Sequence, residues 1–165
     1  MAYNVIESPF PQLVIGWERA KKGKIYPAGS ICLQVSATRG QLVYLDSAQE
    51  VDSRYAVIAP ERNRVRPYYL YCIMELQLPE FLASHQTGLN IRPEILEEFK
   101  IRWHPDPADQ QEAEAEQRAM DEAVRKEAEA LDQIKKLKEY FLDRCFPETG
   151  KNEPRIRWIG GDLEQ

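Results

Sequence analysis

The sequence predicts an α+β protein, in which a small mixed α/β domain with a β-rich core precedes a long C-terminal helix suited to coiled-coil formation. Between residues 30 and 59, short runs rich in aliphatic and aromatic residues are separated by polar turn residues, a pattern typical of β-strands. Residues 108–146, by contrast, contain no Gly or Pro and are rich in Ala, Glu, Lys, Leu and Gln. We therefore expect a globular domain at 1–108, a long helix at 109–146 and a tail at 147–165.

The net charge of -5 is concentrated in the predicted helix. Residues 1–108 carry 12 acidic and 12 basic side chains, whereas residues 109–144 carry 11 acidic and 7 basic side chains. The globular part is therefore neutral overall, and it can present a locally basic face although the whole chain is acidic.

Cysteine usage and hydropathy indicate a cytoplasmic protein with no membrane partner. Cys32, Cys72 and Cys145 are odd in number and widely spaced, which favours neither a disulfide framework nor a metal knuckle. The sequence does not open with a signal peptide, and no apolar run approaches the length needed to cross a bilayer.

The long helix is expected from residue 110 to about residue 146, with Asp109 as N-cap and Glu112 in a capping-box position. Its apolar residues recur at spacings of three, four and seven, which makes a narrow seam typical of a helix paired with another helix. A helix of some 37 residues would be roughly 55 Å long, too long to be buried on a small domain. A solvated helix lying along its own domain is the alternative. The seam consists of Met120, Val124, Leu131, Ile134, Leu137, Phe141 and Cys145.

Several shorter elements are expected in the globular part. Two apolar runs on either side of Gly40 predict a β-hairpin, since Gly tolerates the positive φ that tight turns often need. The expected strands lie at residues 13–15, 30–36, 41–45, 55–59 and 100–104, and the expected helices at 67–76, 79–84 and 92–99.

No pattern in the sequence indicates catalysis. His85 and His104 have no Cys, Asp or His at metal-ligand spacing, and there is no phosphate-cradling Gly loop and no GxSxG motif. The abundant carboxylates lie mostly in the helix, where a solvated face explains them. We expect a non-enzyme that needs no cofactor and no metal.

Five segments, in this order, resemble one half of a type I restriction-modification specificity (S) subunit, which would hold one target-recognition domain and one spacer helix. Residues 26–33 resemble the family's x-x-G-D-I-L entry to a strand, and residues 36–44 resemble its s-x-R-G-x-x-G-x-v turn. The other similar segments are residues 55–58 through 67–71, residues 87–91 with 96–101, and residues 107–111 with 135–138.

The resemblance implies a non-catalytic adaptor. Its recognition domain would read a half-site in duplex DNA, and its helix would act as a ruler and as a dock for adenine methyltransferase (modification) subunits. In full-length members, two recognition domains lie on antiparallel spacer helices, and a homodimer of this chain would restore that arrangement. The alternative is a protein–protein interaction module, derived from this family, that has lost DNA reading and binds or regulates a partner complex.

Candidate DNA contacts follow from side-chain chemistry. Arg39 can pair bidentately with guanine and Gln41 with adenine in the major groove, whereas contacts to phosphate position the protein without specifying sequence. Arg39 as an unpartnered turn residue, and the lysines as a solvated loop, are the alternatives. The base candidates are Ser36, Thr38, Arg39 and Gln41, and the phosphate candidates are Lys21, Lys22, Lys24, Arg62, Arg64 and Arg66.

The three arginines of the last group stand at alternate positions. In an extended segment, Arg62, Arg64 and Arg66 would share one side. Pairing with acids such as Glu61 and Glu75 is the alternative to contact with DNA.

Overall fold

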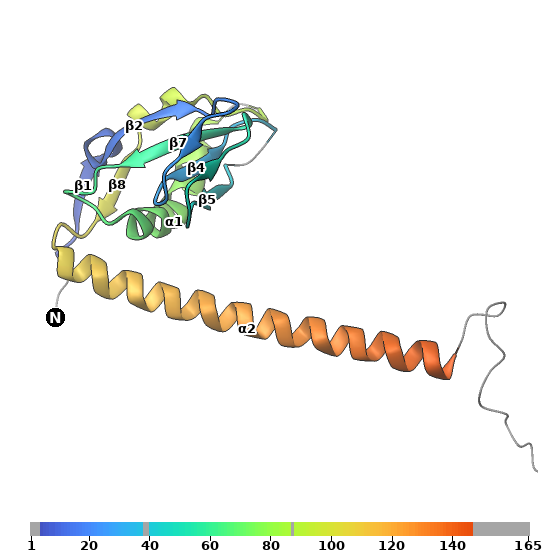
Figure 1. The fold of residues 1–165 in the computed structure, drawn as a ribbon. Helices are drawn as coiled ribbons and strands as arrows, with labels where there is room; N and C mark the ends of the chain where they lie inside the picture. The colour runs from blue at the N-terminus through green and yellow to red at the C-terminus, as the bar shows by residue number, and fades with distance from the viewer. Residues whose placement is uncertain (1–3, 38–39, 87, 147–165) are drawn as a thin grey trace, which may run out of the picture. The chain divides into compact units, whose positions relative to one another are not determined.

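The computed structural model describes residues 4–37, 40–86 and 88–146 (Figure 1). The chain divides into two compact units, Met1–Arg118 and Ala119–Gln165. The long helix α2, Pro107–Cys145, contributes its first turns to the first unit. The predicted α+β class, a mixed domain with a β-sheet core followed by a long helix, is confirmed.

A four-stranded antiparallel sheet forms the centre of the first unit (Figure 1). Two of its strands form the predicted hairpin, in which Ile31 lies opposite Tyr44 and Leu33 opposite Leu42. A register shift interrupts the edge strand between Val14 and Gly16. In spatial order the strands are β2 (Val14–Arg19), β7 (Tyr55–Pro60), β4 (Ile31–Gln34) and β5 (Leu42–Tyr44).

Two smaller antiparallel pairs and two 3-10 turns complete the unit. The strand predicted before the long helix is present, and it pairs with the N-terminal segment. The helix expected at residues 92–99 is a 3-10 turn instead. The pairs are β1 (Ile6–Pro9) with β8 (Lys100–Trp103) and β3 (Ile25–Tyr26) with β6 (Gln49–Glu50), and the turns are η1 (Phe10–Leu13) and η2 (Pro93–Glu97).

The main hydrophobic core lies between the sheet and α1, Pro67–His85. Ile31 and Leu33 face this core, whereas Cys32 belongs to a second buried cluster on the opposite side of the sheet. Strand β4 is therefore buried on both faces, which explains why its sequence is continuously apolar rather than alternating. The helix contributes Tyr69, Leu70, Met74, Leu78 and Leu82 as buried residues.

Helix α1 corrects the prediction of two separate helices. Pro79 lies inside it and removes one backbone hydrogen bond, a loss of about 3 kcal/mol. Leu78 and Leu82 are fully or almost fully buried on either side of the proline. Burial of each such side chain contributes about 1.5–3 kcal/mol. Packing of these side chains against the sheet therefore offsets the lost hydrogen bond, and the helix continues beyond Pro79.

Helix α2 begins three residues before the predicted start, at Pro107. The Oδ1 atom of Asp106 accepts a hydrogen bond of 2.8 Å from the backbone N–H of Ala108, so Asp106 provides the cap that was assigned to Asp109. Proline suits the first helical position because it has no N–H to leave unsatisfied. None of the helices in the described segments could span a membrane.

Gly40 allows the hairpin to pack against α1. Its φ of +91° is disfavoured for other residues, and a Cβ atom there would overlap the Cδ1 atom of Leu82.

We expect Gly40→Ala to lower the free energy of unfolding by about 3 kcal/mol, because the cost of the strained backbone and the cost of overpacking add together. Gly23 also has a positive φ, of +79°, but an added Cβ would meet no atom within 4 Å. Gly23→Ala is therefore the control, and urea denaturation should show a loss of about 1 kcal/mol for it. Equal losses for both variants would contradict the packing argument.

Candidate functional site

The turn between β4 and β5 carries the four base candidates. Ser36 is half-buried, and its hydroxyl accepts a hydrogen bond of 2.9 Å from Nη2 of Arg19. Gln41 is exposed, and its backbone oxygen accepts the N–H of Gln34 at 2.8 Å. Thr38 and Arg39 lie outside the described residues.

The backbone of this turn is held by a residue from a distant loop. Ala37 has a φ of +49°, in the left-handed region that side-chain-bearing residues seldom occupy. Oδ1 of Asn90 accepts the Ala37 N–H at 3.0 Å, and the Ile91 N–H donates to Val35 O at 2.9 Å. Asn90 therefore fixes the backbone at the entry to the predicted reading turn.

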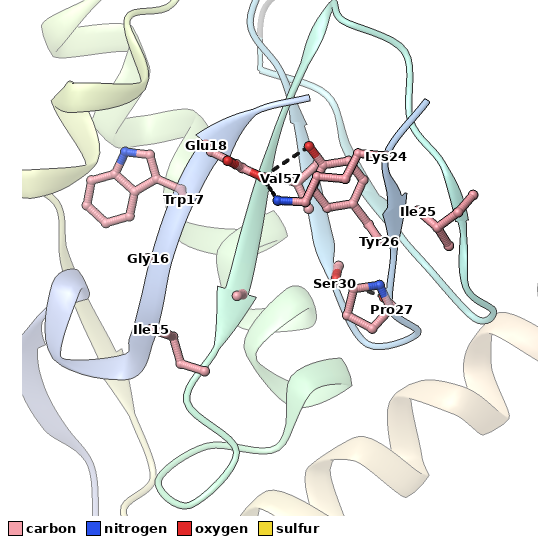
Figure 2. A pocket seen from close by; sticks show the side chains of 11 residues that line it. Ile15, Gly16, Trp17, Glu18, Lys24, Ile25, Tyr26, Pro27, Ser30 and Val57 are labelled. Atoms are coloured by element: carbon pink, nitrogen blue, oxygen red, sulfur yellow. Dashed lines mark hydrogen bonds and ion pairs between the residues drawn. The ribbon is translucent and has the colours of Figure 1, made fainter. Parts of the chain in front are cut away.

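Two of the three candidate lysines pair with Glu18. Figure 2 shows the contacts of Lys24 and Tyr26 with Glu18. The Lys21 ammonium lies 3.1 Å from the Glu18 carboxylate, Lys24 forms a second ion pair with it, and the Tyr26 hydroxyl donates to it at 3.2 Å. Hydrogen bonds from Lys24 and Lys21 lower the pKa of Glu18 to about 2. Lys21 and Lys24 are exposed, and two lysines against one carboxylate leave the cluster with a net positive charge. Lys22 forms no ion pair with any described residue.

A groove of about 350 Å³ opens beside this cluster, on the side of the sheet away from α1 (Figure 2). Ile15 from β2 and Ile25 from β3 line it, and both are exposed. Gly16 and Ala59 also line the groove. The lining is mainly apolar, and its charged members are Glu18 and Lys24, which pair with each other.

The three candidate arginines do not share one side as predicted, because residues 62–64 form a turn rather than an extended segment. Nη2 of Arg62 donates to Ala28 O at 2.5 Å, and Nη1 of Arg64 donates to Gln12 O at 3.4 Å. Arg66 pairs with Glu114 at 2.7 Å rather than with the acids considered from sequence. Each arginine thus binds a different part of the fold.

Gln110 anchors the start of α2 to the sheet domain. It is 1% exposed, the most buried polar residue among those described. Its Nε2 donates to His104 O at 2.8 Å and to Arg64 O at 3.3 Å, and its Oε1 accepts the Arg66 N–H at 2.9 Å. The side-chain amide therefore joins the turn before α1 to the segment that enters α2.

An ionic and aromatic cluster extends this anchor by two helical turns. Glu114 binds both Arg66 and Arg118, the latter at 3.2 Å. Burial opposes ionisation of Glu114, but the hydrogen bonds from the two arginines outweigh it and lower the pKa. The Arg118 guanidinium lies 3.8 Å from the ring centroid of Tyr68, which packs edge-on against Tyr44 of β5. The first three turns of α2 thus belong structurally to the sheet domain.

The predicted interface residues lie in the second unit and are all exposed, by 53% to 66%. Ion pairs between residues four apart also lie on the helix surface, with Lys126 lying 3.5 Å from Glu122 and Lys136 lying 2.7 Å from Asp132. The exposed seam comprises Met120, Val124, Leu131, Ile134, Leu137 and Phe141.

Sequence reasoning did not identify the long-range contacts of Arg19, Asn90, Gln110 and Glu114. Each acts through contacts that are distant in sequence, with separations of 17 residues for Arg19 to Ser36 and 48 residues for Arg66 to Glu114. No local pattern marks such residues. Among the described residues, no group of three or more His, Cys, Asp or Glu could hold a metal ion.

The protein thus belongs to a class in which a mixed α/β domain continues directly into a long helix, here of 39 residues. The sequence matches the family of type I restriction modification DNA specificity domains over residues 2–136, and the chain belongs to that family. It holds one recognition domain and one long helix. No curated protein matches the sequence significantly.

Two solved structures share the fold. The S subunit of a type I restriction-modification system from M. genitalium superposes with a TM-score of 0.63 at 12% identity, over 84% of this chain and 44% of that one. The HsdS subunit from Thermoanaerobacter tengcongensis gives a TM-score of 0.57 at 16% identity, over 92% of this chain and 51% of that one. The chain therefore spans about half the length of these structures.

We expect Gln110→Ala to lower the free energy of unfolding by about 2 kcal/mol, because it leaves one buried N–H and two buried carbonyls without their partner. The matched control is Gln111→Ala, one residue further along and exposed, which should change stability by less than about 0.5 kcal/mol. Thermal unfolding followed by near-UV circular dichroism measures both. A Gln110 variant as stable as the control would show that the amide does not hold the helix start.

Proposed function

We propose that this chain is a non-catalytic DNA-recognition subunit of a type I-like restriction-modification complex. Its sheet domain reads a half-site in duplex DNA, its long helix docks adenine methyltransferase subunits, and two copies pair through their helices. Membership of the specificity-domain family supports the DNA-reading role. The main observation that supports pairing through the helices is the exposed apolar seam of α2.

The seam supports pairing because no described residue covers it. Six large apolar side chains, all more than half exposed, follow one another at helical spacing from Met120 to Phe141. Exposed apolar residues arranged at coiled-coil spacing favour contact with another helix over contact with water. A second copy of the same helix offers the same seam, and antiparallel pairing would place two sheet domains on one duplex.

The length of the helix then determines the spacing of the DNA site. An α-helix of 39 residues is about 58 Å long. In an antiparallel pair, this length would set the distance between two reading domains. The recognised sequence would accordingly be palindromic and interrupted by a gap.

The ion pairs that several of the predicted phosphate contacts form within the chain favour a second function. Lys21 and Lys24 pair with Glu18, and Arg66 pairs with Glu114. A chain that had lost DNA reading would use the helix alone to bind or regulate a partner complex. Salt dependence separates the two functions, because contacts to phosphate release counterions and weaken steeply with salt.

The pairing predicts the effect of a charge placed in the seam. Leu131→Glu should raise the dimer dissociation constant by more than about 100-fold, because each copy would then bury an unpaired carboxylate. Gln133→Glu, two residues away and on a different side of the helix, adds the same charge and should leave the dimer intact. Sedimentation velocity of the full chain measures both. A wild-type chain that remains monomeric at tens of micromolar would contradict homodimer formation.

DNA reading predicts a base-specific effect at Arg39. Arg39→Ala should cost about 1–3 kcal/mol at one base position of a duplex selected from a random library, because a bidentate contact to guanine is lost. Arg102→Ala removes an exposed cation from β8 and serves as the control. Fluorescence anisotropy with single-base variants of the selected duplex gives the profile. Equal weakening on all duplexes would make Arg39 a phosphate contact, and absence of both duplex binding and methyltransferase pull-down would refute the proposed function.

A further inference from the structure

A polar cleft of about 520 Å³ lies beside the predicted reading turn. It is lined by the end of β2, by Val35 and Ser36 after β4, and by residues 90–94. We propose that this cleft binds a backbone phosphate of duplex DNA through Arg19 and Arg92. The inference rests on the proposed DNA-reading function and assigns it a phosphate subsite.

Two hydrogen bonds hold the Arg19 side chain in place and leave some of its N–H donors for an anion. Its Nε donates to Ser53 O at 2.9 Å and its Nη2 to Ser36 Oγ at 2.9 Å. A guanidinium has five N–H donors, so these contacts to described residues use two and leave three for an anion. Two fixed hydrogen bonds lower the side-chain entropy that binding would otherwise cost. An exposed guanidinium oriented in this way suits a phosphate oxygen.

Arg92 brings a second positive charge to the same cleft. Its side chain is exposed and forms no ion pair with any described residue. Arg66, by contrast, pairs with Glu114, and Arg62 and Arg64 donate to the backbone carbonyls of Ala28 and Gln12. A cation without an acid partner can bind phosphate without first breaking an internal ion pair.

The acids of the cleft do not cancel these charges. Of the two that line it, Glu18 is already neutralised by Lys21 and Lys24. Glu94 is exposed at the start of η2 and is the remaining negative group of the lining. The cleft with its flanking lysines therefore has a positive balance, and Glu94 opposes an incoming phosphate.

The cleft is also joined to the predicted base contacts. Ser36 is both a base candidate and the acceptor of the Arg19 hydrogen bond, and its own O–H remains a possible donor to phosphate. Asn90, which lines the cleft, holds Ala37 in its left-handed conformation through a bond of 3.0 Å. A strained backbone held by surrounding contacts often marks a functional position. A phosphate bound here would fix the register in which the turn meets the bases.

The test compares three substitutions that each change one exposed charge in the full-length chain. Arg92→Gln should bind a fluorescein-labelled duplex of random sequence about fivefold more weakly at about 0.15 M salt, since one phosphate contact is lost. Glu94→Gln should bind more tightly, because the acid facing the phosphate is removed. Arg102→Gln, the charge-matched control on β8, should change affinity by less than about twofold. Fluorescence anisotropy measures all three.

Salt dependence gives a second, independent readout. Between about 50 and 200 mM salt, the wild type should lose about 3.5-fold more affinity than Arg92→Gln, as expected for one fewer released counterion. Weakening of the Arg92 variant should be equal on unrelated duplexes.

The outcomes separate the two claims. If the wild type binds duplex and Arg92→Gln matches Arg102→Gln in affinity and salt slope, the cleft is not a phosphate subsite, although DNA reading stands. A change of preference at one base position would likewise overturn the phosphate role. A wild type that binds no duplex at all would overturn the proposed function and this subsite together.

Discussion

The buried amide of Gln110 is the contact on which the organisation of the sheet domain depends. Two N–H donors and one carbonyl on a single side chain satisfy backbone groups of Arg64, Arg66 and His104. Each of these groups would otherwise be a buried polar atom that costs free energy. The amide therefore makes the beginning of α2, the turn before α1 and the end of β8 mutually dependent. The contact thereby fixes the position of the first turn of α2 within the first unit.

Arg62, Arg64 and Arg66 each have a partner within the domain. Arg66 donates its Nε–H to Glu114, whose side chain is 12% exposed and also bound to Arg118, so a contact between Arg66 and a phosphate would compete with this ion pair. A half-buried acid that lost both partners would have to be protonated or resolvated. Arg19 and Arg92 stand under no such constraint, because the acids close to them are either neutralised or exposed. The position of the acids, more than the number of arginines, therefore decides which cations remain available to DNA.

Local patterns in the amino-acid sequence were sufficient to predict much of the fold. The apolar runs around Gly40 predicted the hairpin, and the absence of Gly and Pro after residue 107 predicted α2. Prediction failed where tertiary packing outweighed local preference, as at Pro79, or where two chemically similar caps competed, as at Asp106 and Asp109. The site was less predictable, since the partners of Arg19, Asn90 and Gln110 lie far away in the sequence. The proposed base and phosphate contacts have no local signature beyond the presence of polar residues near a turn.

An overall acidic chain is compatible with DNA reading because its charges are segregated. The described ion pairs of the second unit join residues three or four apart on one helix, where acids and bases largely satisfy each other in water. Screening at physiological salt limits the reach of an exposed charge to about 8 Å. The net negative charge on the distal part of the helix therefore acts mainly on molecules that come close to that part of the helix. An anionic duplex that approached the turn after β4, as proposed, would instead meet the local charges of Arg19, Arg92 and the lysines around Glu18. Net charge is thus a poor guide to the partners of a chain whose net negative charge is concentrated in its long helix.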